Sequence, residues 1–192
     1  ENGLDSQKPI IALLPGSRRQ EVEQMLKVMT ATKLNFPDYQ YVIAGVGNLP
    51  KELYRPFEKE GIKLIVDAAY DLLSAATAAL VASGTATLET ALFEIPQVVC
   101  YKTGSISYAI AKRLIRVPYI SLVNLIAQKE AVKELIQNEL TPQNIVQELQ
   151  FILPKGVKRK TQLEDYRRVK ALLGEKGASE RAGELMVKYL LN

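Results

Sequence analysis

Short apolar runs alternate with longer amphipathic stretches along the first two-thirds of the chain, and this alternation strongly limits the folds open to it. The apolar runs predict strands at residues 10–14, 41–44, 62–66, 78–82, 97–101 and 118–122. The stretches between them predict helices at residues 20–34, 51–60, 69–76, 87–93 and 106–115. Parallel strands need crossover connections, and such crossovers are right-handed. The chain is therefore predicted to form an α/β, Rossmann-like three-layer domain in which helices flank a parallel sheet.

The loops that follow the predicted strands hold the candidate binding residues. Ligands of open parallel sheets bind beyond the carboxyl ends of the strands. Loops at 16–18, 45–47, 83–89 and 102–104, with a last one at Asn124, leave from those ends, so we expect them to line one crevice. The Gly45-Val46-Gly47 loop is either a point of close backbone approach to a ligand or an ordinary turn.

The segment from Ser83 through Gly84 and Thr85 to Glu89 follows the apolar run 78–82. A strand that ends in small and hydroxyl-bearing residues and then begins a helix presents backbone N–H groups and the positive end of the helix dipole to a phosphate. Glu89, about one helical turn further on, could reach a sugar hydroxyl while the phosphates stay at the helix tip. These residues predict a nucleotide-sugar site. The alternative is an ordinary turn in which Ser83 or Thr85 caps the helix.

The loop after the first predicted strand adds a cation to this crevice. Gly16 permits close approach of the backbone to a ligand, and Ser17 adds a hydroxyl. Arg18 offers a rigid guanidinium fork that matches phosphate oxygens. The two loops together predict an anion site with one arginine.

Composition excludes several kinds of chemistry. The chain has no histidine and a single cysteine, which excludes His general bases, Cys–His pairs and disulfides. Cys100 lies in an apolar run and is predicted to be a buried, inert thiol. Because no Asp-x-Asp pair occurs, no metal and no other cofactor is expected. No apolar run approaches the roughly 20 residues of a membrane span, and residues 1–5 lack a signal-peptide pattern, so a cytoplasmic protein is expected.

Charge and secondary structure change towards the end of the chain. Residues 155–192 contain ten Lys or Arg against five Asp or Glu, within a net charge of +4 for the whole chain. Without a nucleic-acid motif, we interpret this region as solvated helix faces and expect no nucleic-acid partner. No strand is predicted after Lys129; helices are expected at 130–138, 141–153, 161–173 and 178–191. The last of these is amphipathic, and its apolar face must pack against this domain, a neighbouring domain or a second copy of the chain, so a homodimer is possible.

Three regions are expected from these patterns. Residues 1–9 are predicted to be a linker from a domain that precedes this one, because they are polar and end at a proline. Residues 10–153 are predicted to form the Rossmann-like domain, and residues 154–192 a helical extension at its carboxyl end.

With these residues in place, the chain resembles the carboxyl-terminal, nucleotide-binding half of lipid-A-disaccharide synthase, a glycosyltransferase of the two-domain GT-B architecture. Five segments carry the resemblance, in this order: Leu13-Leu14-Pro15-Gly16-Ser17-Arg18, Ser83-Gly84-Thr85-Ala86-Thr87-Leu88-Glu89, Pro96-Gln97-Val98-Val99-Cys100-Tyr101, Ser121-Leu122-Val123-Asn124-Leu125-Ile126 and Glu134-Leu135-Ile136-Gln137. Two positions depart from the family pattern: Val123 stands where proline is usual, and Gln128 stands where glycine is common.

The resemblance implies an inverting transfer of 2,3-diacylglucosamine from its UDP donor to 2,3-diacylglucosamine 1-phosphate, with release of UDP. It implies that Arg18 neutralises the diphosphate beside Gly16 and Ser17, and that Ser83, Gly84 and Thr85 hold phosphate oxygens. It further implies that Glu89 binds the ribose hydroxyls, that Asn124 contacts the donor, and that Gln137 lies in the same crevice. The catalytic base and the acceptor are expected in the family's amino-terminal half, so this chain alone is expected to be inactive.

Two other functions and one further contact stay open. A UDP-sugar 2-epimerase or another lipid-sugar transferase of the same architecture would use a similar glutamate, and a non-catalytic nucleotide-sensing module would need no chemistry. Basic residues Lys112, Arg113 and Arg116 beside an apolar stretch suggest peripheral contact with the inner face of the bacterial inner membrane, with a core helix as the alternative.

Overall fold

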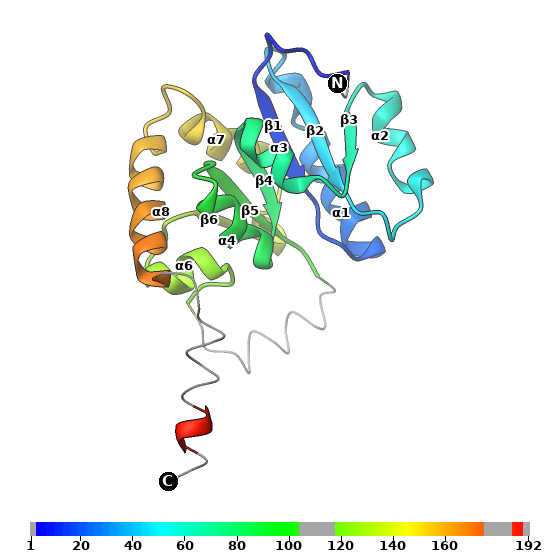
Figure 1. The fold of residues 1–192 in the computed structure, drawn as a ribbon. Coiled ribbons are helices and arrows are strands. Elements are labelled where there is room, and N and C mark those ends of the chain that lie inside the picture. Colours follow the sequence, from blue (N-terminus) through cyan, green and yellow to red (C-terminus); the bar gives the residue numbers. More distant parts are fainter. Residues whose placement is uncertain (1–2, 104–117, 175–185, 190–192) are drawn as a thin grey trace.

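A single parallel sheet organises the computed structural model, which describes residues 3–103, 118–174 and 186–189 (Figure 1). Its order among the described residues is β3-β2-β1-β4-β5-β6, with all neighbouring strands parallel. The strands are β1 (Ile10–Leu14), β2 (Gln40–Gly45), β3 (Lys63–Val66), β4 (Ala76–Ala82), β5 (Gln97–Tyr101) and β6 (Lys133–Ile136). This order places the first and fourth strands side by side at the centre of the sheet.

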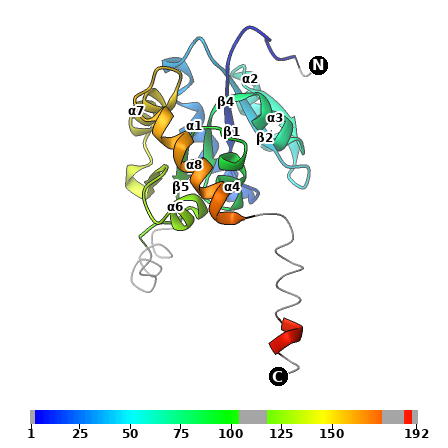
Figure 2. The same ribbon diagram turned by 60° about the vertical axis from the view of Figure 1, so that its left-hand side comes forward.

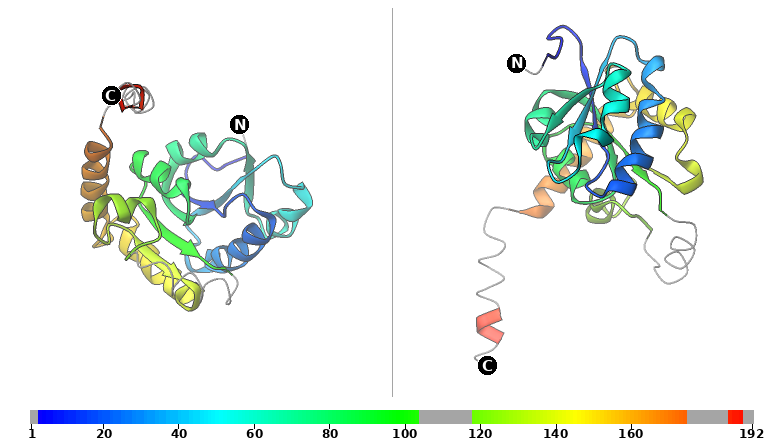
Figure 3. Two further views of the ribbon diagram at one scale, coloured as in Figure 1. Left: turned by 90° about the horizontal axis from the view of Figure 1, so that it is seen from below. Right: turned by 90° about the vertical axis from the view of Figure 1, so that its right-hand side faces the viewer.

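Helices cover both faces of the sheet (Figure 3). One face is covered by α1 (Arg19–Thr30) and α7 (Pro142–Ile152), whose Met25, Leu26 and Leu149 pack on inward-facing residues of the strands. The opposite face is covered by α3 (Ala69–Ala75), α4 (Thr85–Leu92), α6 (Leu122–Ala127) and α8 (Arg159–Leu173). The short helices are α2 (Arg55–Lys59) and the 3₁₀ segments η1 (Lys33–Asn35), η2 (Lys51–Leu53) and η3 (Gln137–Glu139). Successive strand residues contribute to opposite cores because strand side chains alternate between faces. The predicted three-layer α/β architecture is thereby confirmed.

Most predicted elements are confirmed, with boundaries that shift by a few residues. The strands at 10–14 and 97–101 are observed with the predicted ends, and Pro142 lies in the first turn of α7 behind the capping residue Thr141. The predicted helix at 106–115 lies outside the described residues. Of the helix predicted at 178–191, the structure describes residues 186–189, which are helical.

Two predictions near the end of the sheet are wrong. The segment predicted as a strand at 118–122 leads into α6, whose Ser121 accepts a hydrogen bond from the Asn124 N–H as its amino-terminal cap. The segment predicted as a helix at 130–138 contains strand β6, which pairs with β5. Lysine, glutamate and leucine favour helices in isolation, but pairing with a formed strand overrides that local preference.

Helix α8 belongs to the predicted carboxyl-terminal extension and packs on α4 and α6 (Figures 1 and 2). Gln162 accepts a hydrogen bond from the Gln97 N–H at 2.9 Å and donates one to the Gln97 carbonyl at 3.1 Å. Tyr166 and Val169 are buried in the same core as Val99. Among the described residues no helix is long and apolar enough to cross a membrane.

Candidate functional site

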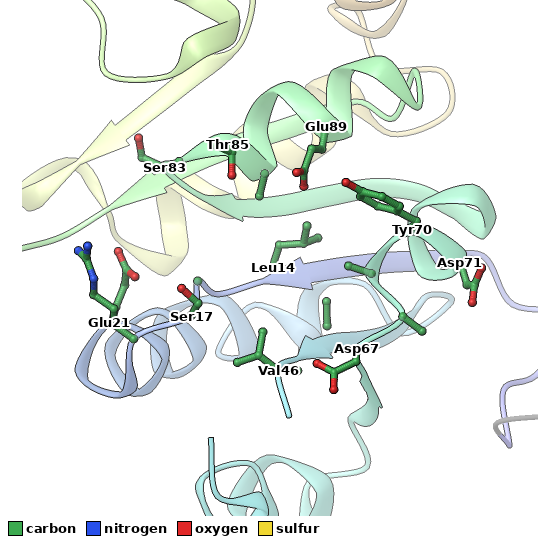
Figure 4. Close-up of a pocket in the computed structure, with 18 residues that line it drawn as sticks. Leu14, Ser17, Glu21, Val46, Asp67, Tyr70, Asp71, Ser83, Thr85 and Glu89 are labelled. Atoms are coloured by element: carbon green, nitrogen blue, oxygen red, sulfur yellow. The ribbon is translucent and has the colours of Figure 1, made fainter. Parts of the chain in front are cut away.

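A cavity of about 750 Å³ opens at the carboxyl ends of the four strands β3, β2, β1 and β4 (Figure 4). The chain adds β2 and β3 to one side of β1 and then places β4 on the other, so connections leave the central strands in opposite directions. Ligands of open α/β sheets bind at such a switch point. Seven of the nine predicted site residues line this cavity: Gly16, Ser17, Arg18, Ser83, Gly84, Thr85 and Glu89.

The turn from β4 into α4 presents backbone to the cavity. Gly84 precedes the first residue of α4, and no side chain caps this end of the helix. The Ser83 hydroxyl donates instead to the Ile120 carbonyl at 3.2 Å. A Cβ placed on Gly84 would meet no atom within 4 Å, so packing does not demand a glycine here. The prediction of a Ser83 or Thr85 cap is therefore wrong, and the amino-terminal end of α4 borders the cavity.

The turn from β1 into α1 contributes the cation. Gly16 has a φ of +99°, and a Cβ there would lie 2.6 Å from a carboxylate oxygen of Glu21. Arg18 precedes α1 in an extended conformation and forms no ion pair with any other described residue. Its neighbour Arg19 is paired with Glu23 at 3.2 Å and does not line the cavity. The guanidinium of Arg18 is thus available to an anion in the cavity.

The ends of β2 and β3 also line the cavity, and Asp67 at the β3 end is a residue that the sequence interpretation missed. Asp67 follows β3 directly, and its carboxylate accepts a hydrogen bond from the Gly47 N–H at 2.8 Å. Gly45 and Val46 lie on the cavity wall, so the loop at 45–47 belongs to the site. The signal that could have found Asp67 was its position immediately after a predicted strand.

Tyr70 and Glu89 face each other across the cavity from α3 and α4, and Figure 4 shows the Tyr70 hydroxyl directed towards the Glu89 side chain. The negative charge of Glu89 raises the pKa of Tyr70, and a hydrogen bond between the two side chains adds to that shift. The Tyr70 hydroxyl therefore keeps its proton at neutral pH and is available as a donor to the Glu89 carboxylate that it faces.

The structure corrects the predicted role of Asn124. Its side chain is fully buried, its amide nitrogen donates to the Val132 carbonyl at 2.8 Å and to Glu134 at 2.9 Å, and its amide oxygen accepts from the Val132 N–H. Asn124 does not line the cavity. Because these bonds use both amide N–H donors and the side chain is fully buried, Asn124 holds α6 to β6 and lies out of reach of a ligand in the cavity.

Gln137 is also absent from the cavity wall. Its side chain accepts from the Thr103 N–H at 3.4 Å and donates to the Thr103 carbonyl at 3.2 Å, which joins the ends of β5 and β6. The prediction that it shares the crevice with Arg18 and Glu89 is therefore corrected: Gln137 follows β6, and its side chain bonds to Thr103 in the loop after β5.

The single cysteine lies in the core as predicted. Burial raises the pKa of the Cys100 thiol to about 12, so it stays protonated near neutral pH. Within the described ranges, no group of three or more Cys, Asp or Glu side chains is arranged to hold a metal ion.

Residues 1–188 match a family model described as Lipid-A-disaccharide synthetase. The chain belongs to this family. It is 40% identical over 196 residues to a lipid-A-disaccharide synthase of Syntrophus aciditrophicus, covering 98% of this chain and 51% of that relative. It is 41% identical over 150 residues to one of Coxiella burnetii, covering 76% of this chain and 40% of the relative. The chain thus spans about half the length of the curated relatives it matches.

Solved structures share the fold at low sequence identity. The calicheamicin glycosyltransferase CalG4 aligns with a TM-score of 0.59 and 17% identity, covering 95% of this chain and 43% of that one. A UDP-GlcNAc 2-epimerase from Neisseria meningitidis, solved with UDP-GlcNAc bound, aligns with a TM-score of 0.53 and 14% identity, covering 88% and 44%. At these identities the likeness shows the fold alone. This chain therefore has the fold of a Rossmann-like domain, of the kind that forms one half of a GT-B fold.

Proposed function

We propose that this chain is the donor-binding part of a lipid-A-disaccharide synthase, which holds UDP-2,3-diacylglucosamine while its sugar passes to 2,3-diacylglucosamine 1-phosphate. The observation that carries the proposal is one cavity at the switch point of the sheet that gathers Arg18, the amino-terminal end of α4 and Glu89. The family membership of the chain supplies the class of substrate.

Each cavity residue has a role that its chemistry suits. Arg18 neutralises the diphosphate, with Gly16 and Ser17 beside it, because a guanidinium matches phosphate oxygens in shape and charge. Residues 83–85 hold further phosphate oxygens with the N–H groups and the dipole of α4. Glu89 accepts hydrogen bonds from the ribose hydroxyls.

The same groups stabilise the leaving group. Negative charge grows on UDP as the glycosidic bond breaks, so fixed N–H groups and a guanidinium stabilise the transition state more than the ground state. With these groups in place, the reaction we propose is inverting and needs no metal at the diphosphate. The acceptor and the base that takes its proton belong to the part of the family's length that this chain does not span.

The acylated substrates also bear on where the protein works. We propose a cytoplasmic location with peripheral contact at the inner face of the inner membrane. The basic residues that suggested this contact, Lys112, Arg113 and Arg116, lie outside the described residues. Sedimentation with vesicles tests it: binding that does not change when anionic lipid is added would exclude the contact.

Calorimetric titration with UDP tests donor binding. We expect Arg18→Ala to weaken UDP binding about 10- to 100-fold, since a charged hydrogen bond contributes about 1.5–3 kcal/mol. Arg19→Ala is the matched control, because Arg19 lies next in the chain but is paired with Glu23 outside the cavity. It should change the affinity less than twofold. A folded chain that gives no heat with UDP would contradict the proposal, and turnover of a non-acylated UDP-sugar by the full-length protein would favour the epimerase alternative.

A further inference from the structure

At the cavity, side chains from two helices that are separated in sequence face each other. Tyr70 lies in α3 and Glu89 in α4, and their side chains point towards each other over the space above Leu14 (Figure 4). Both residues line the cavity, so a ligand that reaches Glu89 lies beside the tyrosine as well.

The ring of Tyr70 is held although it is 56% exposed. It packs on Phe93, which follows the last residue of α4, with ring centroids 5.4 Å apart and planes tilted by 38°. Aromatic pairs at this separation favour a defined ring orientation. The contact therefore directs the hydroxyl at Glu89 even though solvent reaches the ring.

Among the described residues, few interactions besides the one with Tyr70 hold the Glu89 carboxylate in place. Within the described part of the chain, no ion pair holds its carboxylate, and Figure 4 shows the Tyr70 hydroxyl directed towards it. A carboxylate has two oxygens and about four acceptor sites, so one donated hydrogen bond leaves room for two more donors. A glutamate side chain that is already oriented loses less rotamer freedom when a ligand binds.

We propose that Tyr70 is a positioning residue of the donor site: its hydroxyl holds the Glu89 carboxylate towards the cavity, so that the remaining acceptor sites meet the ribose hydroxyls of the nucleotide. This inference rests on the proposed function, because it takes the ligand of Glu89 to be a ribonucleoside diphosphate. Tyr70 acts through Glu89 and contributes nothing to phosphate binding.

Titration of UDP and of 2′,3′-dideoxy-UDP into matched variants tests the inference. Tyr70→Phe removes the hydroxyl and keeps the ring on Phe93. We expect it to weaken UDP binding about 3- to 10-fold, which is the size of one hydrogen bond to a charged group that is partly exposed. Tyr70→Phe should leave the affinity for the dideoxy nucleotide unchanged, since that ligand offers Glu89 no hydroxyl. The double variant Tyr70→Phe, Glu89→Ala should bind UDP no more weakly than Glu89→Ala alone.

Tyr39→Phe is the control for the substitution itself, because Tyr39 also packs on a phenylalanine, Phe36, but lies outside the cavity. The positioning role would be overturned if Tyr70→Phe bound UDP as tightly as the unchanged chain, or if it lowered the affinity for both nucleotides equally. The proposed donor site would not be affected by that result, because Arg18→Ala tests it separately. Failure of the unchanged chain to bind UDP would instead overturn the proposed function together with this inference.

Discussion

The amide nitrogen of Asn124 donates a hydrogen bond to Glu134 at 2.9 Å, and both side chains are buried. The same carboxylate accepts bonds from the Ser121 N–H at 2.9 Å, the Ser121 hydroxyl at 2.7 Å and the Ile120 N–H at 3.0 Å. Ile120 in turn accepts the bond from the Ser83 hydroxyl at the cavity. Asn124 and Glu134 therefore act on the site through the loop that supports Ser83, and their own atoms stay away from it.

Asn124→Ala should lower stability and leave the intrinsic affinity for UDP nearly unchanged. The substitution leaves the Val132 N–H, the Val132 carbonyl and one Glu134 oxygen without this partner, and we expect a loss of about 2–4 kcal/mol in the free energy of unfolding. Urea denaturation measures the loss. Asn144→Ala is the control, since its exposed amide bonds the Glu139 carbonyl; it should cost no more than about 1 kcal/mol. Glu134 keeps its bonds to Ile120 and Ser121 in this variant, so a folded Asn124→Ala chain with tenfold weaker UDP binding would contradict the purely structural role of Asn124.

Gly84→Ala and Gly16→Ala should separate binding from folding. At Gly84 the φ of 160° is extended and a Cβ meets open space, so alanine should cost at most about 1 kcal/mol of stability. It should nevertheless weaken UDP binding, because the methyl group enters the cavity where phosphate would approach the backbone. At Gly16 the φ of +99° and the nearby Glu21 carboxylate predict a stability loss of about 1–3 kcal/mol. Urea denaturation and calorimetry on both variants measure the two effects; equal UDP affinity for Gly84→Ala and the unchanged chain would count against a phosphate site at this turn.

Alkaline pH should destabilise the fold through Tyr41. Burial raises the pKa of this residue to about 12, although its hydrogen bond with Thr32 acts in the opposite direction. The folded state therefore keeps a proton that the unfolded chain loses near pH 10, so the contribution of Tyr41 is complete below pH 10 and is lost as the pH rises towards 12. The slope is at most about 1.4 kcal/mol per pH unit. Above pH 10, the free energy of unfolding of Tyr41→Phe should fall less steeply with pH than that of the unchanged chain. At neutral pH, Tyr41→Phe should lose about 1 kcal/mol of that free energy because its hydrogen bond with Thr32 is missing.

Gln128→Gly should stabilise the chain. Gln128 ends α6 in the left-handed conformation, with a φ of 54°, and its side chain is exposed. Glycine adopts this conformation without the Cβ penalty, which predicts a gain of about 1 kcal/mol in thermal or urea unfolding. The matched control is Gln147→Gly in the exposed face of α7, which should lose about 1 kcal/mol because glycine is a poor helix residue. A destabilising Gln128→Gly would show that its side chain makes a contact worth more than the backbone strain.

Gln128 also shows how a family pattern acquires a physical reason. Glycine is common in the family where this chain has Gln128, yet the residue is exposed and absent from the cavity wall, so space for a ligand does not explain the glycine. The backbone conformation at the end of α6 explains the family's glycine. Its αL geometry is set by how α6 meets β6, which one-dimensional patterns do not contain.

The sequence by itself determined the architecture and most of the cavity. Continuous apolar runs such as 10–14 and 97–101 can be satisfied only as strands covered on both faces, and turns at their carboxyl ends must meet at one edge of a parallel sheet. For that reason the sequence predicts Arg18, Ser83 and Glu89 in one crevice, and all three line the cavity.

Only the tertiary structure decided which partners the polar side chains near β6 bind. Residues 133–136 form a strand because they pair with the edge of β5. This pairing places Glu134 next to α6, where it accepts a hydrogen bond from the side chain of Asn124. The approach of Tyr70 and Glu89 likewise depends on α3 and α4 lying on the same face of the sheet. Local spacing predicts which residues reach an edge of the sheet, whereas the partners of a buried or facing polar group come from segments distant in the chain.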